Sequence, residues 1–394
     1  MTYPERFSTL PAYAFPRLRA LLDDHAPGGD VIHMTIGEPK HAFPPWVTDV
    51  IAENAALFNN YPANDGTDEL RGSIRDWLER RYGVSLAADK NIMPLNGTRE
   101  GLYNVTMALC PSEKNGQRAA VLLPNPFYQV YMLAAISIEA ESILVPATEE
   151  TGHLPDYANA DPAVLARTVA VYICSPANPQ GAVADQAYWQ TLFELAEKYD
   201  FKVFADECYS EIYKDTPPPG ALQVARDMGI NPERVVAFHS LSKRSNLPGL
   251  RSGFVAGGDE SISRIKTLRT YAGTPIPGPI QAASAALWRD EAHVVENRAL
   301  YAEKYDLADQ ILGDLPSYTS PEAGFFLWLK VPDGEAAALT LWKETGVRVL
   351  PGAYLAREVD GMNPGENYIR VAMVAPKEQM VQGLKAMRTT LFQA

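Results

Sequence analysis

The sequence is poor in cysteine and has fewer basic than acidic residues. Its 394 residues include only three cysteines, with no Cys-x-x-Cys or metal-ligand spacing: Cys110, Cys174 and Cys208. This excludes a disulfide framework and favours reduced thiols in the core of a protein from a reducing compartment. The net charge of -13 argues against nucleic acid or an anionic membrane surface as a partner. Any anionic ligand must therefore be bound by a local cluster of cations.

Several familiar signals are also missing. The sequence contains no Gly-x-Ser-x-Gly, His-Glu-x-x-His or Gly-x-Gly-x-x-Gly motif, and its six histidines are scattered. We therefore expect no metal site. The N-terminus lacks a basic segment followed by an apolar one, and no apolar run approaches membrane-spanning length. We expect a cytoplasmic protein, large enough for one larger and one smaller domain.

Short apolar runs alternate with helical patterns from about residue 90. The runs 119–123, 169–174 and 201–205 are continuously apolar, which is typical of strands covered on both faces in a mostly parallel sheet. After residue 280 a helical stretch, 281–312, precedes an α+β pattern that ends in a helix over 376–392. In parallel sheets the ligand lies beyond the carboxyl ends of the strands. The residues at those ends are Gly97, Tyr128, Asn178, Asp206, Tyr209 and Lys243.

One segment carries the strongest chemical signal. Residues 240–253 read Ser-Leu-Ser-Lys-Arg-Ser-Asn-Leu-Pro-Gly-Leu-Arg-Ser-Gly, between two apolar runs that predict buried strands. A lysine in a partly dry loop has a lowered pKa and can form an imine. Ser240, Ser242 and Arg251 together suit a phosphate dianion. By itself, a basic surface loop explains Lys243 about equally well.

This segment resembles the signature of the class I/II pyridoxal-phosphate aminotransferases of fold type I, and departs from it at Ser252, where an aliphatic residue is usual. The resemblance extends from Ile36 to Arg370. It implies an α/β fold: a large cofactor-binding domain (46–285) with a mostly parallel seven-stranded sheet sandwiched by helices, a smaller α+β domain (286–394), and an N-terminal arm with part of the small domain (1–45).

The resemblance also implies the roles of individual residues around pyridoxal 5'-phosphate. Lys243 would bind the cofactor covalently and then serve as general base, and Asp206 would pair with the pyridine nitrogen. Asn178 and Tyr209 would bond the ring 3-oxygen. Tyr128 would stack on the ring, with Phe127 as the alternative one place earlier. The phosphate group and its surroundings would involve Gly97, Thr98, Arg99, Ser240, Ser242, Arg251 and, from the other subunit of a homodimer, Tyr61.

Substrate recognition is implied in the same way. Arg370 would grip the α-carboxylate of amino-acid and 2-oxo-acid substrates, beside Asn178, and Gly37 would lie on the segment that closes over it. Blocks such as 36–41, 96–100 and 242–246 are similar to bacterial succinyldiaminopimelate aminotransferases. This implies glutamate as donor and N-succinyl-2-amino-6-oxopimelate as acceptor. Both have a distal acid group, for which the candidate cations are Lys40, Arg99 and Arg244.

Other interpretations remain open at this stage. Asp206 could be a helix N-cap, Asn178 a turn residue, the two tyrosines core aromatics, and Arg370 a salt-bridge partner. Within the same family, the activity could be directed to aspartate or aromatic amino acids, or be that of a β-lyase. A non-catalytic pyridoxal-phosphate regulator is the alternative from another class, although this acidic chain has no basic helix for DNA.

Overall fold

The computed structural model describes residues 5–8, 10 and 12–392, so the first four residues of the segment examined for a targeting signal lie outside it. Seven strands form one sheet in the order β2-β10-β9-β8-β7-β5-β6, and β10 alone runs antiparallel to its neighbours in it. The expected mostly parallel seven-stranded sheet is confirmed. The strands are β2 (Ile92–Leu95), β5 (Ala120–Asn125), β6 (Glu141–Pro146), β7 (Thr168–Cys174), β8 (Lys202–Asp206), β9 (Val235–Ser240) and β10 (Gly253–Gly257).

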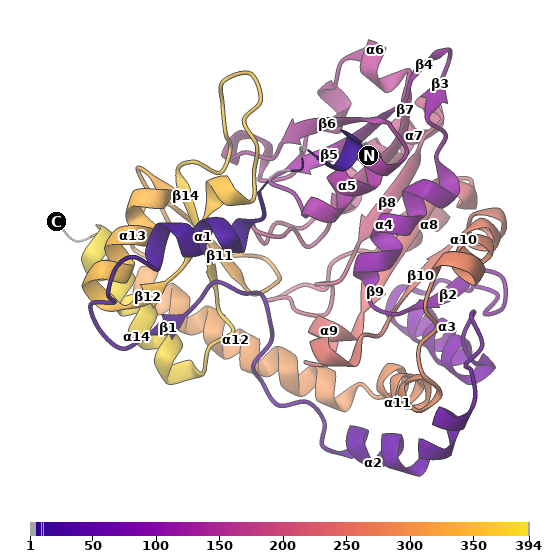
Figure 1. Ribbon diagram of the computed structural model, residues 1–394, viewed down its shortest axis with the longest axis horizontal. Helices are drawn as coiled ribbons and strands as arrows, with labels where there is room; N and C mark the ends of the chain where they lie inside the picture. Colours follow the sequence, from indigo (N-terminus) through magenta and orange to yellow (C-terminus); the bar gives the residue numbers. More distant parts are fainter. Residues whose placement is uncertain (1–4, 9, 11, 393–394) are drawn as a thin grey trace.

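Helices cover both faces of this sheet, which explains its continuously apolar strands. On β5, Val121 and Leu123 belong to one core cluster, whereas Leu122 belongs to the cluster on the other face. Because neighbouring side chains of a strand point to opposite faces, both sets must be apolar. The first face carries α4 (Thr98–Leu109), α5 (Gln129–Ser137) and α10 (Asp259–Ala272); the second carries α7 (Gln186–Tyr199) and α8 (Ala221–Met228) (Figure 1).

A second, smaller assembly combines segments from the N-terminal and C-terminal parts of the chain, whereas the first described turn, Glu5–Phe7, lies against α5 of the large region. Its antiparallel sheet has the order β11-β14-β13, and β1 pairs in parallel with β12 beside it. The segment 347–350 therefore divides between two sheets. The elements are α1 (Ala14–Leu22), β1 (Ile32–His33), β11 (Phe326–Lys330), α13 (Gly334–Thr345), β12 (Val347–Arg348), β13 (Leu350–Pro351), β14 (Tyr368–Ala372), α14 (Lys377–Met387) and a π-helical turn (Arg388–Phe392) that ends the expected last helix.

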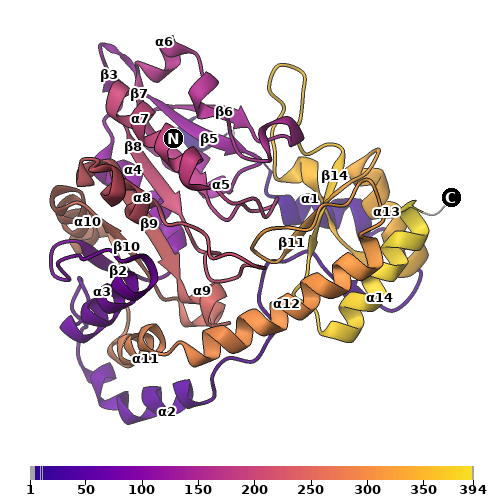
Figure 2. The ribbon, with the colours of Figure 1, turned by 180° about the vertical axis from the view of Figure 1, so that it is seen from behind.

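The expected helical stretch 281–312 is interrupted. Helix α11 (Gly278–Arg289) ends at Asp290, whose backbone is extended, and α12 (Ala292–Leu312) begins two residues later. Helix α11 packs on α2 (Trp46–Glu53) and α3 (Asp68–Tyr82), whereas α12 runs from the large sheet region to the small one (Figure 2). We therefore propose that the large domain ends at this break rather than at residue 285, inside α11.

The helices of the described chain, residues 5–392 without 9 and 11, include none that is both long enough and apolar enough to cross a bilayer. The remaining short elements are α6 (Pro162–Leu165), α9 (Leu241–Arg244) and a hairpin of β3 (Glu113–Lys114) and β4 (Gln117–Arg118). Of these, α9 matters for function, because it carries Lys243 between β9 and β10.

Candidate active site

A cavity of about 440 Å³ lies where the carboxyl ends of β7, β8 and β9 face the smaller assembly. The last residues of these strands, Cys174, Asp206 and Ser240, line it from the sheet. Phe326 and Arg370 of the small sheet line it from the opposite side. The predicted residues in the lining are Gly37, Thr98, Arg99, Tyr128, Asn178, Asp206, Tyr209, Ser240, Ser242, Lys243, Arg251 and Arg370. The fold thus brings together residues that are far apart in the sequence.

Asp206 is held rigidly at the end of β8. It is buried, and its carboxylate accepts hydrogen bonds from the Tyr131 hydroxyl at 2.7 Å and the Cys208 main-chain N–H at 3.3 Å. Burial raises the pKa of Asp206, while these hydrogen bonds favour the ionised form and oppose the rise. A buried, ionised carboxylate favours a cationic partner. A protonated ring nitrogen would be such a partner. Sequence reasoning missed Tyr131, although its position three residues after Tyr128 at a helix start was a usable signal.

A ring of small polar donors surrounds Arg251. The Ser240 hydroxyl accepts the Ser242 N–H at 3.1 Å, and Thr98 begins helix α4, whose first N–H groups have no partner inside the helix. Gly97 precedes it with φ +83°, and a Cβ there would overlap the Arg251 guanidinium. Only glycine permits both the turn and the close approach. These donors fit a phosphate dianion, which is the test that a pyridoxal-phosphate site must pass.

Ser252, the departure from the family signature, leaves this cradle untouched. It is buried, and its hydroxyl accepts a hydrogen bond from Ser284 of α11 at 2.8 Å. Its main-chain oxygen accepts the Leu241 N–H at 3.1 Å. Ser252 therefore connects the segment 240–253 to α11, and it is not among the residues that line the cavity.

Lys243 lies at the centre of the cavity wall. Its amine donates a hydrogen bond to the main-chain oxygen of Gly37, and it lies 5.4 Å from the Phe325 ring centre and 5.9 Å from that of Tyr209. Burial lowers the pKa of Lys243 to about 8. At pH 7 about a tenth of an amine with this pKa is unprotonated, far more than for an ordinary lysine, and only the unprotonated form can act as a nucleophile or proton acceptor.

Arg370 faces the cavity from β14 with unused hydrogen-bonding capacity. Its guanidinium is buried and donates to Asn178 Oδ1 at 3.0 Å and to the Thr35 main-chain oxygen at 2.7 Å. Its Nε has no hydrogen-bond partner in the described part of the chain. Burial lowers the pKa of Arg370 to about 10. A carboxylate would satisfy the free N–H and compensate the buried charge.

Aromatic residues and one exposed arginine complete the lining. Arg99 Nε donates to the Tyr128 hydroxyl at 2.7 Å, and both residues line the cavity. Phe127 is buried and also lines it, so the choice between Phe127 and Tyr128 as the stacking residue stays open. Tyr209 is buried and packs edge-on against Phe325 at 5.4 Å. The lining also includes residues to which the sequence analysis assigned no role: Tyr13, Phe15, Ile36, Phe326 and Leu355.

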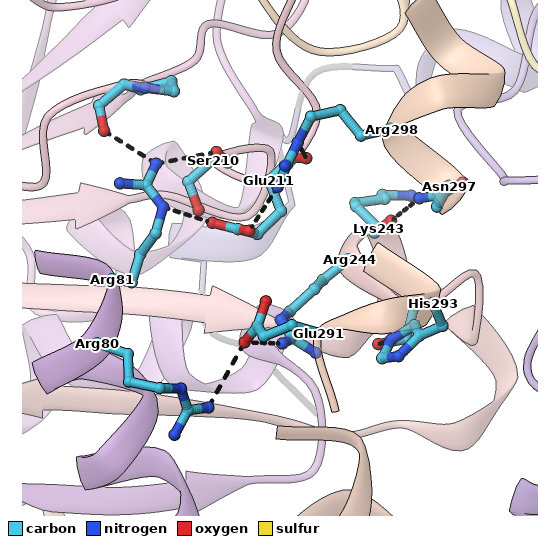
Figure 3. A network of polar contacts seen from close by, with 12 residues as sticks. Arg80, Arg81, Ser210, Glu211, Lys243, Arg244, Glu291, His293, Asn297 and Arg298 are labelled. Atoms are coloured by element: carbon cyan, nitrogen blue, oxygen red, sulfur yellow. Dashed lines mark hydrogen bonds and ion pairs between the residues drawn. The ribbon is translucent and has the colours of Figure 1, made fainter. Parts of the chain in front are cut away.

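Three residues that were predicted to contact the cofactor or the substrate do not line the cavity. Lys40 pairs on the surface with Glu38 at 2.6 Å, and Tyr61 is fully exposed; neither lines the cavity. Arg244 is buried, donates to the Leu287 oxygen at 2.7 Å and pairs with Glu291 at 2.8 Å (Figure 3). The prediction that Arg244 binds a distal acid is wrong for this chain, because Arg244 does not line the cavity and already pairs with Glu291.

The cysteines are free, as expected, but all three have intermediate exposure rather than lying fully in the core. Cys174 and Cys208 have intermediate exposure and line the cavity. The reason is their position, because Cys174 ends β7 and Cys208 follows the end of β8. The Cys208 sulfur lies 3.2 Å from the Thr98 hydroxyl.

Comparisons with known proteins agree with this geometry. Residues 29–387 match the family model described as aminotransferase class I and II. An LL-diaminopimelate aminotransferase from Dehalococcoides mccartyi is 30% identical over 100% of each chain. An aminotransferase structure from Neisseria meningitidis is 39% identical, with a TM-score of 0.93 over 98% of each chain. A probable N-succinyldiaminopimelate aminotransferase from Thermus thermophilus is 25% identical, with a TM-score of 0.84, over 96% of this chain and 100% of that one.

The family model covers most of the described chain and both sides of the cavity. Enzymes of this family use pyridoxal phosphate, and the donors around Arg251 and the carboxylate of Asp206 fit that group. The chain therefore belongs to the class I and II aminotransferases of fold type I.

Proposed function

We propose that this aminotransferase moves an amino group between glutamate and N-succinyl-2-amino-6-oxopimelate, as in the synthesis of diaminopimelate and lysine. The observation that carries the proposal is the presence of Arg370 and Arg99, both facing one cavity beside Lys243. Neither guanidinium has a carboxylate within ion-pair distance among the described residues. Two unpaired cations favour substrates with two acid groups.

When bound, pyridoxal phosphate supplies an electron sink for the charge that develops at the substrate Cα. The phosphate would be held by Thr98, Ser240, Ser242 and Arg251 together with the α4 N-terminus. Asp206 would hold the proton on the ring nitrogen, and Tyr131 keeps this carboxylate in place. Lys243 Nζ would leave the Gly37 oxygen, accept the proton from the substrate Cα and donate it to C4′ of the cofactor.

The substrate α-carboxylate would take over the hydrogen bonds of Arg370. The guanidinium now donates to Thr35 O and Asn178 Oδ1, and a carboxylate can replace a neutral acceptor with a stronger, charge-assisted bond. The free Nε supplies a further donor. Arg370 would therefore orient the Cα–H bond toward Lys243 by holding the neighbouring acid group.

Arg99 is the remaining candidate for the distal acid group. It is exposed at the start of α4, and its Nε is fixed by the Tyr128 hydroxyl, so its outer N–H groups are available for a second carboxylate. Arg99→Gln should raise KM for glutamate and for the succinylated acceptor without changing cofactor binding. Lys40→Gln is the matched control, because Lys40 pairs with Glu38 outside the cavity. Equal KM values for Arg99→Gln and the parent would remove Arg99 from the proposal.

LL-diaminopimelate itself is the second candidate substrate. It is supported by the curated relatives, several of which are named LL-diaminopimelate aminotransferase at 28% to 32% identity. The succinylated acceptor rests instead on the sequence blocks and on the Thermus thermophilus structure. Both compounds carry a distal acid group, so the cavity cations suit either one.

A panel of half-reactions tests the proposal. Purified protein with cofactor is mixed with glutamate, and the loss of the cofactor's carbonyl-form absorbance is followed; the product is then mixed with candidate acceptors. We expect recovery with N-succinyl-2-amino-6-oxopimelate. Conversion with LL-diaminopimelate in place of glutamate favours the second candidate, and pyruvate with ammonia from cystathionine would indicate a β-lyase. Activity confined to aspartate or aromatic amino acids would overturn both candidates.

A homodimer is proposed on separate grounds. Tyr61 is fully exposed, and Phe58 and Tyr271 are 60% and 88% exposed. Exposed aromatic residues of this size favour burial against another protein surface. We propose that a second copy covers them and that Tyr61 reaches the phosphate of that copy. Sedimentation of the parent and of Tyr61→Ala, with cofactor dissociation measured in both, tests the assembly and the role of Tyr61 separately. The cytoplasmic location stays a prediction.

A further inference from the structure

Lys243 is carried by a helix too short to hold its own position. Helix α9 spans only Leu241–Arg244, a single turn, and an isolated turn is unstable because its nucleus fixes several residues for one hydrogen bond. The carbonyls of a helix's last turn also lack partners within the helix. The main-chain oxygen of Lys243 is one of these. Something outside α9 must therefore fix the main chain of Lys243 whenever its side chain moves.

Asn297 of α12 provides that contact. Its side chain is 4% exposed, and its Nδ2 donates to the Lys243 main-chain oxygen at 3.3 Å (Figure 3). Its Oδ1 accepts Asn246 Nδ2 at 3.0 Å and lies 3.1 Å from His41 Nδ1. A carbonyl oxygen can only accept, so the contact with Lys243 determines which way the amide faces.

Each neighbour of Asn297 belongs to a segment that the proposed reaction uses. Asn246 follows α9 with φ +54°, a left-handed conformation that asparagine adopts more readily than most residues with a side chain. Among the described residues, its amide donates only to Asn297 and, at 3.4 Å, to the Ala42 oxygen. His41 closes the segment that begins at Gly37, whose oxygen accepts the Lys243 amine. One amide thus connects the main chain of Lys243 with the chain that contacts its side chain.

The groups that contact the Asn297 side chain are uncharged. Burial, followed by the charge of Lys304, lowers the pKa of His41, so its imidazole is neutral at physiological pH. The His41 ring packs on Tyr301 at 4.6 Å, and the Lys304 amine donates to the oxygens of Met373 and Ala375. No carboxylate lies among the described contacts of Asn297. An amide can supply the donor and the acceptors here without introducing a charge.

We propose that Asn297 is a positioning residue for Lys243: it holds the main chain of α9 while the lysine side chain moves, and it ties that main chain to the segment 37–41. The catalytic consequence rests on the proposed function, whereas the structural consequence does not. The adjacent Arg298 pairs with Glu211 at 3.1 Å, two residues after Tyr209 (Figure 3). Consecutive residues of α12 thus brace the segments that carry Lys243 and Tyr209.

The first test uses cofactor-free protein. In Asn297→Ala the amide N–H groups of residues 241–247 should exchange with deuterium at least about tenfold faster, while those of β8 keep the parental rate. Asn297→Asp keeps both acceptor contacts but sets a carboxylate oxygen against the Lys243 carbonyl, so it should behave like the alanine variant. His293→Ala is the matched control: His293 bonds Ser245 at 2.8 Å from the same helix but does not contact Lys243.

The second test uses enzyme with cofactor. Asn297→Ala should lower kcat about 10-fold to 100-fold, since a small misplacement of a reacting group has effects of this size. KM for glutamate should stay within about twofold, and the isotope effect of Cα-deuterated glutamate should increase, because proton transfer becomes slower. A residue that only supports the fold would change the melting temperature and leave the isotope effect unchanged.

The outcomes separate the two proposals. Parental exchange rates in residues 241–247 of both Asn297 variants overturn the inference, whatever the enzyme does. A parental kcat and isotope effect in Asn297→Ala also overturn it. If the parent protein transfers no amino group to any acceptor of the panel, the proposed function fails, while the exchange experiment still decides the role of Asn297.

Discussion

At the sheet edge Asp206 is held by a side chain and a strand end, whereas the segment after β1 holds the cavity cations Lys243 and Arg370 through main-chain oxygens. Asp206 is bonded by Tyr131, a residue anchored in the core of the large domain. Arg370 and Lys243 instead donate to the oxygens of Thr35 and Gly37. These oxygens belong to the segment after β1, which has no regular structure there.

The difference suits the two ligands that the cavity has to accept. A cofactor that stays bound is best served by groups that do not move, because their ordering cost is met once during folding. A substrate that enters and leaves needs cations whose present partners are easily replaced. A main-chain oxygen is a neutral acceptor, so a carboxylate displaces it with a gain in hydrogen-bond strength.

The largest effect is expected from Lys243→Ala. It removes the nucleophile and the proton acceptor at once, so kcat should fall by about 10³-fold. Single-turnover mixing with glutamate measures this loss. Cofactor retained through the sheet-side groups is the internal control, because Arg251 and Asp206 are unchanged. A variant that transfers amino groups at the parental rate would contradict the assignment of Lys243.

Asp206→Asn should come second, with a fall of about 10²-fold in kcat, since it removes the carboxylate that would keep the ring nitrogen protonated and the ring electron-poor. The absorbance and pH titration of the bound cofactor report the loss independently. Tyr131→Phe is the matched control: it removes one hydrogen bond and keeps the carboxylate, so it should have a much smaller effect. Equal losses in the two variants would mean that Asp206 acts only through its position.

Arg370→Lys tests the opposite side. A lysine keeps the charge but lacks the planar pair of donors, so kcat/KM for glutamate should fall about 30-fold, equivalent to about 2 kcal/mol. The loss should appear in KM for every α-carboxylate substrate, with the cofactor spectrum unchanged. A loss confined to kcat would place Arg370 with the rigid groups of the sheet side and weaken the comparison.

The smallest expected effect concerns pH. The pKa of Lys243 is lowered by burial from 10.5 to about 8 in the folded cofactor-free protein. Between these values the unfolded chain binds more protons, so the contribution of Lys243 to stability increases with pH and is lost as pH falls to about 8. Lys243→Met should reduce the rise of the free energy of unfolding over this pH range by about 1 kcal/mol. The effect is small because solvent in the cavity screens the amine. Urea unfolding from pH 7.5 to 10.5 measures it.

The comparison with Lys243→Met also cancels the contribution of a second buried lysine, Lys304. Burial lowers the pKa of Lys304 to about 8 as well, but Lys304 is present in both proteins. The difference between the two stability curves therefore isolates Lys243. Parallel curves over this range would show that the amine titrates at its ordinary pKa.

Patterns of adjacent residues predicted the strand-end residues of the site well and the residues from other segments less well. Asp206 and Lys243 follow apolar runs, and strand ends of a parallel sheet meet at one edge, so their proximity could be inferred. Phe326 could not be assigned, because it looks like an ordinary core aromatic until its neighbours are known. Tyr131 was missed, although its position after Tyr128 at a helix start was a usable signal. The break at Asp290 was also missed, since the helical pattern continues on both sides of it.

Arg244 shows the limit most clearly. It adjoins Lys243 in the sequence, yet consecutive residues of a helix differ by about 100° in direction. The side chain of Lys243 therefore lines the cavity, while that of Arg244 is buried away from it and pairs with the partly exposed Glu291. No local pattern distinguishes the two directions, because both residues are basic.

The sequence alone determined the sheet and the order of its strand-end residues, because apolar runs and turn motifs act over a few residues. It also carried the resemblance from which the family could be inferred. Only the tertiary structure decided which cations face the cavity, which oxygens hold them, and that Asn297 reaches the main chain of Lys243. Those contacts join segments far apart in the chain, and they exist only once the sheets and α12 are packed together.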